Sequence, residues 1–232
     1  MKALLVHPAF WLTMTLLAYM LATRFHAFCQ HNALSHPLLV CMALLIPLLL
    51  LTHTPYADYM NSVRGIHLLL APATVALAVP LYTNLAHVRS MLRPLLIALV
   101  IGGLTGIISA LLLGKLFGLP THVLVSFSPK SVTTPIAMAL AEKLGGDASI
   151  AAAAVVITGI LGAMTAEYLL RALRVRDEAV QGFSMGLAAH GIGTSRAFHI
   201  SHKAGAFASL GMSLNGIFTS LCLPLLLAVW PM

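Results

Sequence analysis

Two short polar stretches interrupt a sequence of 232 residues that is otherwise strongly apolar. The first is Ser128–Pro135, Ser-Pro-Lys-Ser-Val-Thr-Thr-Pro, which combines one cation, four hydroxyl groups and two prolines. The second is His190–Arg196, His-Gly-Ile-Gly-Thr-Ser-Arg, about 60 residues further along the chain. Ammonium, guanidinium and hydroxyl groups all donate hydrogen bonds to a carboxylate. The two stretches are therefore candidates for one site that binds a small anion.

Lys130 is the cation of the first stretch, and Ser131, Thr133 and Thr134 accompany it. A charge in the middle of a membrane costs roughly 3 kcal/mol to insert, so an intramembrane lysine is a functional candidate by default. Pro135 prevents a regular helix through the residue before it. A helix that begins there points its positive dipole end and its unbonded amides at the site. The alternative is that Lys130 extends to an interface or caps a helix end.

The second stretch has four polar side chains: His190, Thr194, Ser195 and Arg196. Gly191 and Gly193 allow close backbone approach and positive φ angles. Arg196 has the planar fork that pairs with a carboxylate through two hydrogen bonds. The alternatives are a glycine-rich surface loop with Arg196 at the interface, and a packing role for His190.

Three residues outside the two stretches are weaker candidates. Thr74 follows a proline in an apolar segment, where it could line the site. Asn215 lies in the last apolar segment, either as a hydrogen-bonding residue between helices or as a ligand contact. Glu167 is the acid inside an apolar run, and Arg171 follows it by four residues. We interpret that pair as structural, with proton or ion coupling at Glu167 as the alternative.

The composition excludes a soluble protein. Only 8% of the residues are charged and 59% are hydrophobic, whereas a soluble domain carries about 25% charged residues. At about 20 residues per crossing, the length gives room for roughly seven to nine membrane passes. The net charge of +7 lies in short loops, which indicates anionic lipid and cytoplasmic loops rather than nucleic acid. Three isolated cysteines, without metal-ligand spacing, are expected to be reduced packing residues.

We therefore expect an all-α polytopic membrane protein, built as a transporter-like helical bundle with two discontinuous or re-entrant segments. It forms a single transmembrane domain over residues 1–232, with N-terminal helices over 1–62 and a core over 63–232. The broken segments lie near 121–144 and 180–203.

The distribution of Lys and Arg bears on topology, because short cytoplasmic loops collect these residues. If the loop with Arg89 and Arg93 is cytoplasmic, a first break that crosses the membrane places Arg171–Arg176 outside, which is unfavourable. If the first break turns back, that loop is cytoplasmic, and the second break enters from the face opposite to the first. Two such segments can meet near the middle of the membrane, where irregular backbone must be buried or line a cavity.

A weak internal repeat also favours a transporter. Three similar apolar segments centre on Gly103, Gly159 and Gly216, at spacings of 56 and 57 residues. The repeating unit is one broken segment followed by one whole helix. Transporter sites commonly form between such repeats.

Enzymatic and metal chemistry are not expected. The adjacent Lys130 and Ser131 suggest a hydrolytic dyad, but neighbours in sequence rarely align as nucleophile and base, and no oxyanion motif accompanies them. The eleven histidines lack the spacing of a metal site. We expect no cofactor; coupling to a proton or a sodium ion is left open.

Several strings of this sequence resemble the LrgB/CidB family over nearly the whole chain. They are Pro72–Tyr82, Pro129–Ala137 (Pro-Lys-Ser-Val-Thr-Thr-Pro-Ile-Ala), Ile157–Gly162 and His190–Ala197. Two positions, Ala71 and Glu167, depart from the residues common in that family, and neither lies in a polar stretch.

The resemblance implies a bacterial inner-membrane protein with a holin-like or antiholin-like role in murein hydrolase control and lysis. The family that this chain resembles also includes the plastid glycolate/glycerate transporter of plants, in which an LrgA-like part is fused ahead of the LrgB-like part. The resemblance thus implies a separate small LrgA/CidA-like partner and a small monocarboxylate substrate of the glycolate, glycerate, pyruvate or lactate type. We also expect a homo-oligomer. The rival interpretation is a holin-like protein that permeabilises the membrane.

Overall fold

The computed structural model describes residues 8–29, 35–69, 72, 75–76 and 78–229. The described residues are mostly helical and contain no strand, so the predicted all-α membrane class is confirmed. The chain divides into two compact units, Met1–Ala76 and Leu77–Met232. The finer division into helices over 1–62 and a core over 63–232 stays a prediction. Thr74, a candidate from the sequence, lies outside the described residues.

The N-terminal unit contains four described helices: α2 (Pro8–Phe28), α3 (Pro37–Leu51), α4 (Tyr56–Ser62) and α5 (Arg64–Leu68). Small residues allow the two longer helices to approach each other, and Ala18 and Ala22 of α2 pack on Cys41 of α3. Trp11 is buried and its ring meets that of Tyr59 edge-on, with 5.9 Å between the centroids. This aromatic contact fixes α4 against α2.

The C-terminal unit contains the remaining described helices. They are α7 (Ala78–Thr83), α8 (Leu85–Ser90), α9 (Leu92–Leu116), α10 (Thr121–Phe127), α11 (Thr134–Lys143), α12 (Ala148–Ala172), α13 (Glu178–Ile200) and α14 (His202–Val229). In the part of the chain that the structure describes, α9, α12 and α14 are long and apolar enough to cross a membrane. That is fewer than the seven to nine passes for which the length gives room. Helix α3 is apolar but has only 15 residues, and α10 and α11 are shorter still.

Helix α10 turns back along α9 instead of crossing beside it. Leu124 lies against Gly114, near the C-terminal end of α9. Further along, the Lys130 Nζ donates a hydrogen bond to the Gly106 carbonyl oxygen at 3.1 Å. Because Gly106 lies nearer the middle of α9, the chain has moved from the end of the bundle towards its centre.

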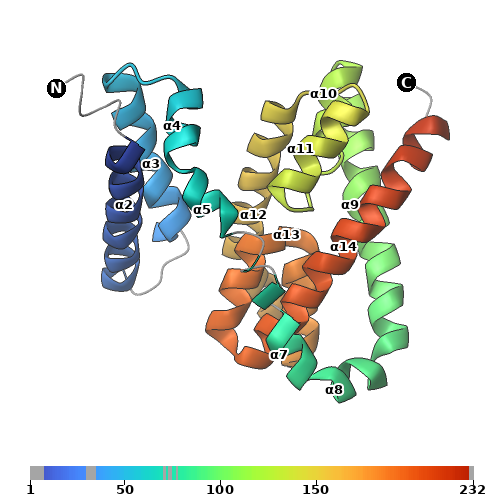
Figure 1. Cartoon of the computed structure of the whole chain (residues 1–232). Coiled ribbons are helices and arrows are strands. Elements are labelled where there is room, and N and C mark those ends of the chain that lie inside the picture. The colour runs from blue at the N-terminus through green and yellow to red at the C-terminus, as the bar shows by residue number, and fades with distance from the viewer. Residues whose placement is uncertain (1–7, 30–34, 70–71, 73–74, 77, 230–232) are drawn as a thin grey trace. The chain divides into compact units, whose positions relative to one another are not determined.

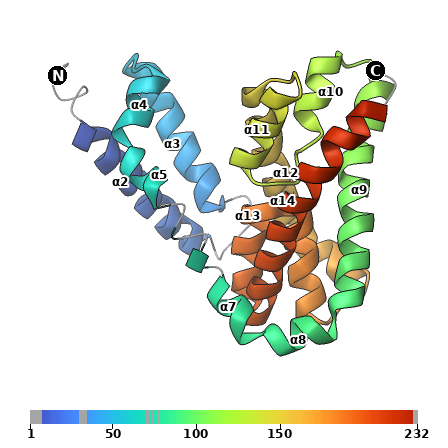
Figure 2. The same ribbon diagram turned by 45° about the vertical axis from the view of Figure 1, so that its right-hand side comes forward.

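Helix α11 then turns back beside α10, as both views show (Figures 1 and 2). After it, the Asp147 amide donates to the Ser126 Oγ, near the C-terminal end of α10, at 2.7 Å. The Asp147 carboxylate accepts from two amides in the first turn of α12 and so starts that helix. Residues 121–143 therefore form a re-entrant helical hairpin, called hairpin 1 below, with its tip at residues 128–133.

Helix α13 is a second re-entrant hairpin, called hairpin 2 below. A straight helix of 23 residues would be about 35 Å long. Instead, the Ser201 Oγ just after the helix donates to the Glu178 Oε2 at its start, at 2.8 Å. The helix breaks at Ala189 and His190, which have non-helical dihedral angles, and His190 has a φ of 42°. These two residues are the tip of hairpin 2.

The two hairpins enter the bundle from opposite ends. Hairpin 1 lies at the end where α9 finishes and α12 begins, and hairpin 2 lies where α12 finishes and α14 begins, as both views show (Figures 1 and 2). This arrangement agrees with the one inferred from the loop charges. Each broken segment turns back, and the two tips point towards the same level of the bundle.

Each hairpin and the long helix after it form one repeating unit. Three pairs of boundaries are each 57 residues apart: Thr121 and Glu178, Lys143 and Ile200, and Ala172 and Val229. The same offset separates Thr134, where α11 starts, from Gly191, which follows the break in hairpin 2. Since the hairpins enter from opposite ends, the two units form an inverted repeat of the kind found in transporters.

The hairpin topology predicts a labelling pattern. In a variant without native cysteines, Leu119→Cys and Glu142→Cys, which flank hairpin 1, react with a membrane-impermeant maleimide from the same side of oriented vesicles. Arg176→Cys and His202→Cys, which flank hairpin 2, react from the opposite side. All four side chains are exposed. Labelling of one flanking pair from two different sides would show that the segment crosses.

Candidate functional site at the hairpin tips

Asn215 of α14 connects the two hairpins. Its side chain is 1% exposed, and its Nδ2 donates to the Ser131 carbonyl oxygen at 3.1 Å and to the Leu187 carbonyl oxygen at 3.0 Å. Ser131 lies in the tip of hairpin 1, and Leu187 lies two residues before the tip of hairpin 2. The two polar stretches, far apart in sequence, therefore meet on either side of this one amide.

The tip of hairpin 1 holds the first group of candidate residues. Lys130 and Ser131 are half-buried against Gly106 of α9, and the bond to the Gly106 carbonyl uses one of the three ammonium hydrogens. Thr133 precedes α11 in an extended conformation and forms no side-chain cap. Thr134, the first residue of α11, is half-buried. Because no side chain caps this helix, the amides of its first turn lack a side-chain acceptor, and such amides favour an anion.

His190 fixes the tip of hairpin 2 to α12. The side chain is buried, and its Nε2 is 2.9 Å from the Val155 carbonyl oxygen. A carbonyl oxygen only accepts, so Nε2 carries the hydrogen and Nδ1 is the acceptor nitrogen of the neutral ring. The Thr194 Oγ1 donates to the His190 carbonyl oxygen at 2.8 Å, which uses that hydroxyl within the hairpin.

Of the remaining residues of the second stretch, Gly193 is buried and contributes to packing, whereas Gly191 and Ser195 are exposed. Gly193 lies where an added Cβ would clash with the Met185 carbonyl oxygen, so it lets the two arms of hairpin 2 approach each other. Gly191 and Ser195 are exposed and four residues apart on the second arm. Of this stretch, Gly191 and Ser195 are therefore the residues most accessible to a ligand.

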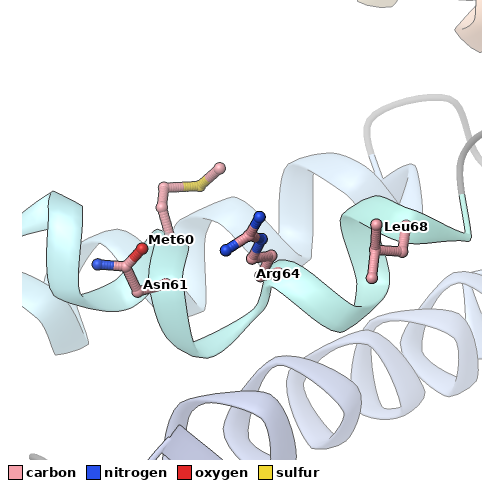
Figure 3. A pocket seen from close by; sticks show the side chains of 4 residues that line it. All are labelled: Met60, Asn61, Arg64 and Leu68. Atoms are coloured by element: carbon pink, nitrogen blue, oxygen red, sulfur yellow. The ribbon is translucent and has the colours of Figure 1, made fainter.

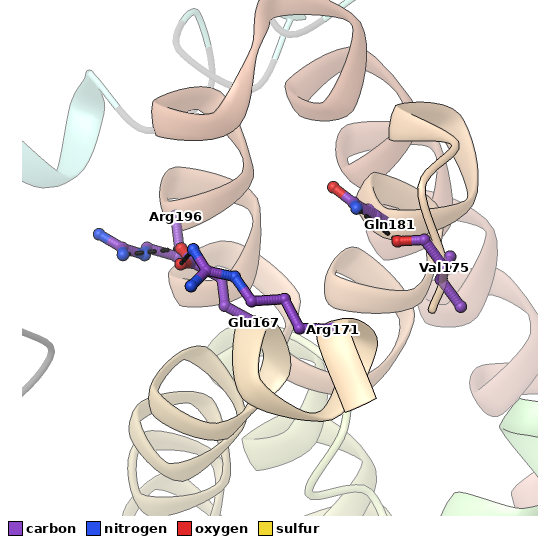
Figure 4. A network of polar contacts seen from close by, with 5 residues as sticks. All are labelled: Glu167, Arg171, Val175, Gln181 and Arg196. Carbon is purple, nitrogen blue, oxygen red and sulfur yellow. Dashed lines mark hydrogen bonds and ion pairs between the residues drawn. The ribbon is translucent and has the colours of Figure 1, made fainter. Parts of the chain in front are cut away.

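Arg196 is placed differently from Lys130. Its Nη2 is 2.7 Å from the Glu167 Oε1 of α12, and both side chains are about three-quarters buried. The predicted pair of Glu167 with Arg171 also forms, but at 3.7 Å and with Arg171 79% exposed. Figure 4 shows the Glu167 carboxylate between the two guanidinium groups. The sequence suggested Arg171 as the partner of Glu167, and the structure adds Arg196 as the closer one.

Other features of the described residues lie apart from the tips. The described chain contains no group of three His, Cys, Asp or Glu side chains that could hold a metal ion. A shallow hollow on α4 and α5 is lined by Met60, Asn61, Arg64 and Leu68 (Figure 3). It belongs to the N-terminal unit, whereas the tips belong to the C-terminal unit.

Sequence reasoning missed the groups that hold the tips in place. They are the backbone carbonyls of Gly106, Val155 and Leu187, which accept from Lys130, His190 and Asn215. Every residue has a carbonyl group, so no residue type marks these acceptors. The only available signal was indirect, since small residues such as Gly106 permit close approach.

The Glu167–Arg196 ion pair predicts a measurable coupling. Glu167→Gln should lower stability by about 1–2 kcal/mol, because it leaves a largely buried guanidinium without its carboxylate. In a double-mutant cycle with Arg196→Gln, the second substitution should cost less than it does alone. Thermal unfolding in detergent measures this. Arg171→Gln is the matched control and should change stability little, because Arg171 is exposed; additive effects at Glu167 and Arg196 would contradict the coupling.

Comparison with known proteins places the chain in a family. The sequence model of the LrgB-like family matches residues 15–229. The uncharacterised protein YwbG of Bacillus subtilis (strain 168) is 38% identical over 192 residues, which cover 83% of this chain and 85% of YwbG. The antiholin-like protein LrgB of Bacillus cereus (strain B4264) is 28% identical over 218 residues, which cover 94% and 95% of the two chains. No solved structure matches. The chain belongs to the LrgB-like family.

Proposed function

We propose that the protein is a transporter, or a transporter subunit, for small monocarboxylates of the glycolate, glycerate, pyruvate or lactate type. The observation that carries this proposal is the meeting of two hairpin tips at Asn215. At each tip a short helix begins, at Thr134 in one and at Gly191 in the other. Half-helices that begin inside the bundle direct amides at an anion, as in known transporter sites.

Lys130 and the first turn of α11 are proposed to hold the carboxylate. The ammonium group has hydrogens beyond the one that Gly106 accepts, and it neutralises the charge. The hydroxyls of Ser131 and Thr133 lie in the same tip, and that of Thr134 lies at the start of α11; all three can donate to the carboxylate oxygens. A substrate with a single carboxylate fits this single cation.

The tip of hairpin 2 is proposed to recognise the uncharged end of the substrate. The exposed Gly191 and Ser195 offer a backbone amide and a hydroxyl. His190 has its Nε2 on the Val155 carbonyl, so only Nδ1 can accept from a 2-hydroxyl group or take up a coupled proton. Arg196 already shares its guanidinium with the Glu167 carboxylate, which offsets its charge and gives Arg196 a secondary role in the proposal.

The cellular setting is part of the same proposal. The apolar helices α9, α12 and α14 support placement in a bilayer, and we assign it to the bacterial inner membrane with several passes. An LrgA/CidA-like small membrane protein is the proposed partner, with the chain itself as a homo-oligomer. No enzymatic step and no cofactor are part of the proposal, and the coupling ion is either a proton or a sodium ion.

The second candidate is a holin-like or antiholin-like protein that modulates membrane permeability and murein hydrolase activity. The name of the Bacillus cereus relative, antiholin-like protein LrgB, favours it. Such a protein needs a lipid-facing surface that assembles, but it has no need of a cation inside a hairpin tip. The half-buried Lys130 on the Gly106 carbonyl therefore supports transport over a non-selective pore.

Lys130→Ala should lower uptake of radiolabelled glycolate or pyruvate into proteoliposomes roughly tenfold or more, because a charge-assisted bond to the substrate is lost. Lys143→Ala is the matched control, since Lys143 is an exposed lysine of the same hairpin, and it should transport normally. Normal uptake by the Lys130→Ala variant would contradict the proposal that Lys130 binds the substrate carboxylate.

The same vesicles separate the two candidate functions. A transporter should exchange short monocarboxylates in counterflow and retain an encapsulated fluorescent dye. A permeabilising protein should release dyes of several sizes with or without Lys130. Dye release without carboxylate exchange would decide for the second candidate, and adding an LrgA/CidA-like partner tests whether either activity requires it.

A further inference from the structure

We propose that Asn215 is a positioning residue that couples the two hairpin tips, so that they respond to each other as one unit. The inference goes beyond the proposed function, because it concerns the mechanical connection of the tips whatever they bind. It starts from one buried carboxamide whose nitrogen donates to both hairpins, at 3.1 and 3.0 Å.

The two carbonyls that Asn215 binds are those that the helix breaks leave without a helical partner. In a continuous helix, the Ser131 carbonyl would accept from the residue four positions later, which is Pro135 and has no amide hydrogen. The Leu187 carbonyl would accept from Gly191, but the non-helical Ala189 and His190 intervene. The side-chain amide of Asn215 replaces both missing donors.

The chemistry of the carboxamide suits this role. A primary amide has two hydrogens on one planar nitrogen, and each is directed at a different hairpin. The Asn215 Oδ1 accepts from the Thr219 Oγ1 one turn along α14 at 3.4 Å. Because both amide hydrogens are used on the protein itself, the geometry favours the interhelical role of Asn215 over the alternative of a ligand contact.

A shared donor makes the tips interdependent. If one tip moves, the planar amide must turn, and the bond to the other tip changes length or angle. A ligand or a substitution that shifts one tip therefore biases the other, and such coupling acts equally in both directions. The inverted repeat explains why one residue suffices, since the two tips reach the same level of α14 from opposite ends.

The first part of the proposal is that Asn215 holds both tips in place. It is tested by hydrogen exchange of the purified protein in lipid nanodiscs, measured by mass spectrometry without substrate. Asn215→Leu keeps the branched shape and the number of side-chain heavy atoms and removes both donors, so amides in 128–134 and in 187–193 should exchange roughly tenfold faster. The matched control is Ser209→Ala, a buried polar residue of the same helix whose hydroxyl donates to the Gly205 carbonyl. It should leave both tips unchanged.

The coupling itself needs a second comparison. Lys130→Ala perturbs the tip of hairpin 1 and should also speed exchange in 187–193; in the Asn215→Leu background this remote effect should vanish. A response of only one tip to Asn215→Leu, or a remote effect that persists without Asn215, would overturn the proposal. If Asn215→Leu does not accumulate in membranes, Asn215→Ala also removes both donors and should give the same pattern. No transport is measured, so the outcome is independent of whether the protein carries carboxylates.

Discussion

Broken helices inside an apolar bundle leave backbone carbonyls without partners, and the structure depends on satisfying them. In lipid such groups cannot form hydrogen bonds with water. Irregular backbone is therefore tolerated only where other protein groups supply the missing hydrogen bonds or where it lines a water-filled cavity. Asn215 supplies two donors to the carbonyls of Ser131 and Leu187, next to the two breaks. His190 adds a third hydrogen bond, from hairpin 2 to the Val155 carbonyl of α12. These bonds explain why the breaks are held at one level of the bundle.

The same breaks leave a helix start without a side-chain cap and a cation with only part of its donors used by the fold. The first turn of α11 has no side-chain cap, and Lys130 spends one ammonium hydrogen on the Gly106 carbonyl. The carbonyls of Ser131 and Leu187 accept hydrogen bonds from within the protein, whereas Lys130 has further ammonium hydrogens to donate. This asymmetry is the basis of the anion site that we propose. In the proposed transporter, hairpin 1 supplies the cation and hairpin 2 the uncharged contacts, so the two tips would bind opposite ends of one small molecule.

The ion pair of Glu167 with Arg196 gives the second cation a different position from the first. A guanidinium at 2.7 Å from a carboxylate is largely neutralised, and it ties the outgoing arm of hairpin 2 to α12. Lys130, by contrast, faces a carbonyl oxygen, which accepts a hydrogen bond without cancelling its charge. The net positive charge at the tips therefore comes from hairpin 1, although both polar stretches contain a cation.

The sequence by itself determined the membrane class, the all-helical fold, the two breaks and the family. These follow from local properties: few charges, long apolar runs, prolines and glycines at fixed places, and a specific string around Lys130. Only the tertiary structure decided that both segments turn back, that Arg196 meets Glu167, and that Asn215 joins the tips. Those contacts pair Asn215 with carbonyls 84 and 28 residues away. Their acceptors are backbone atoms common to every residue, and only the folded chain can select among them.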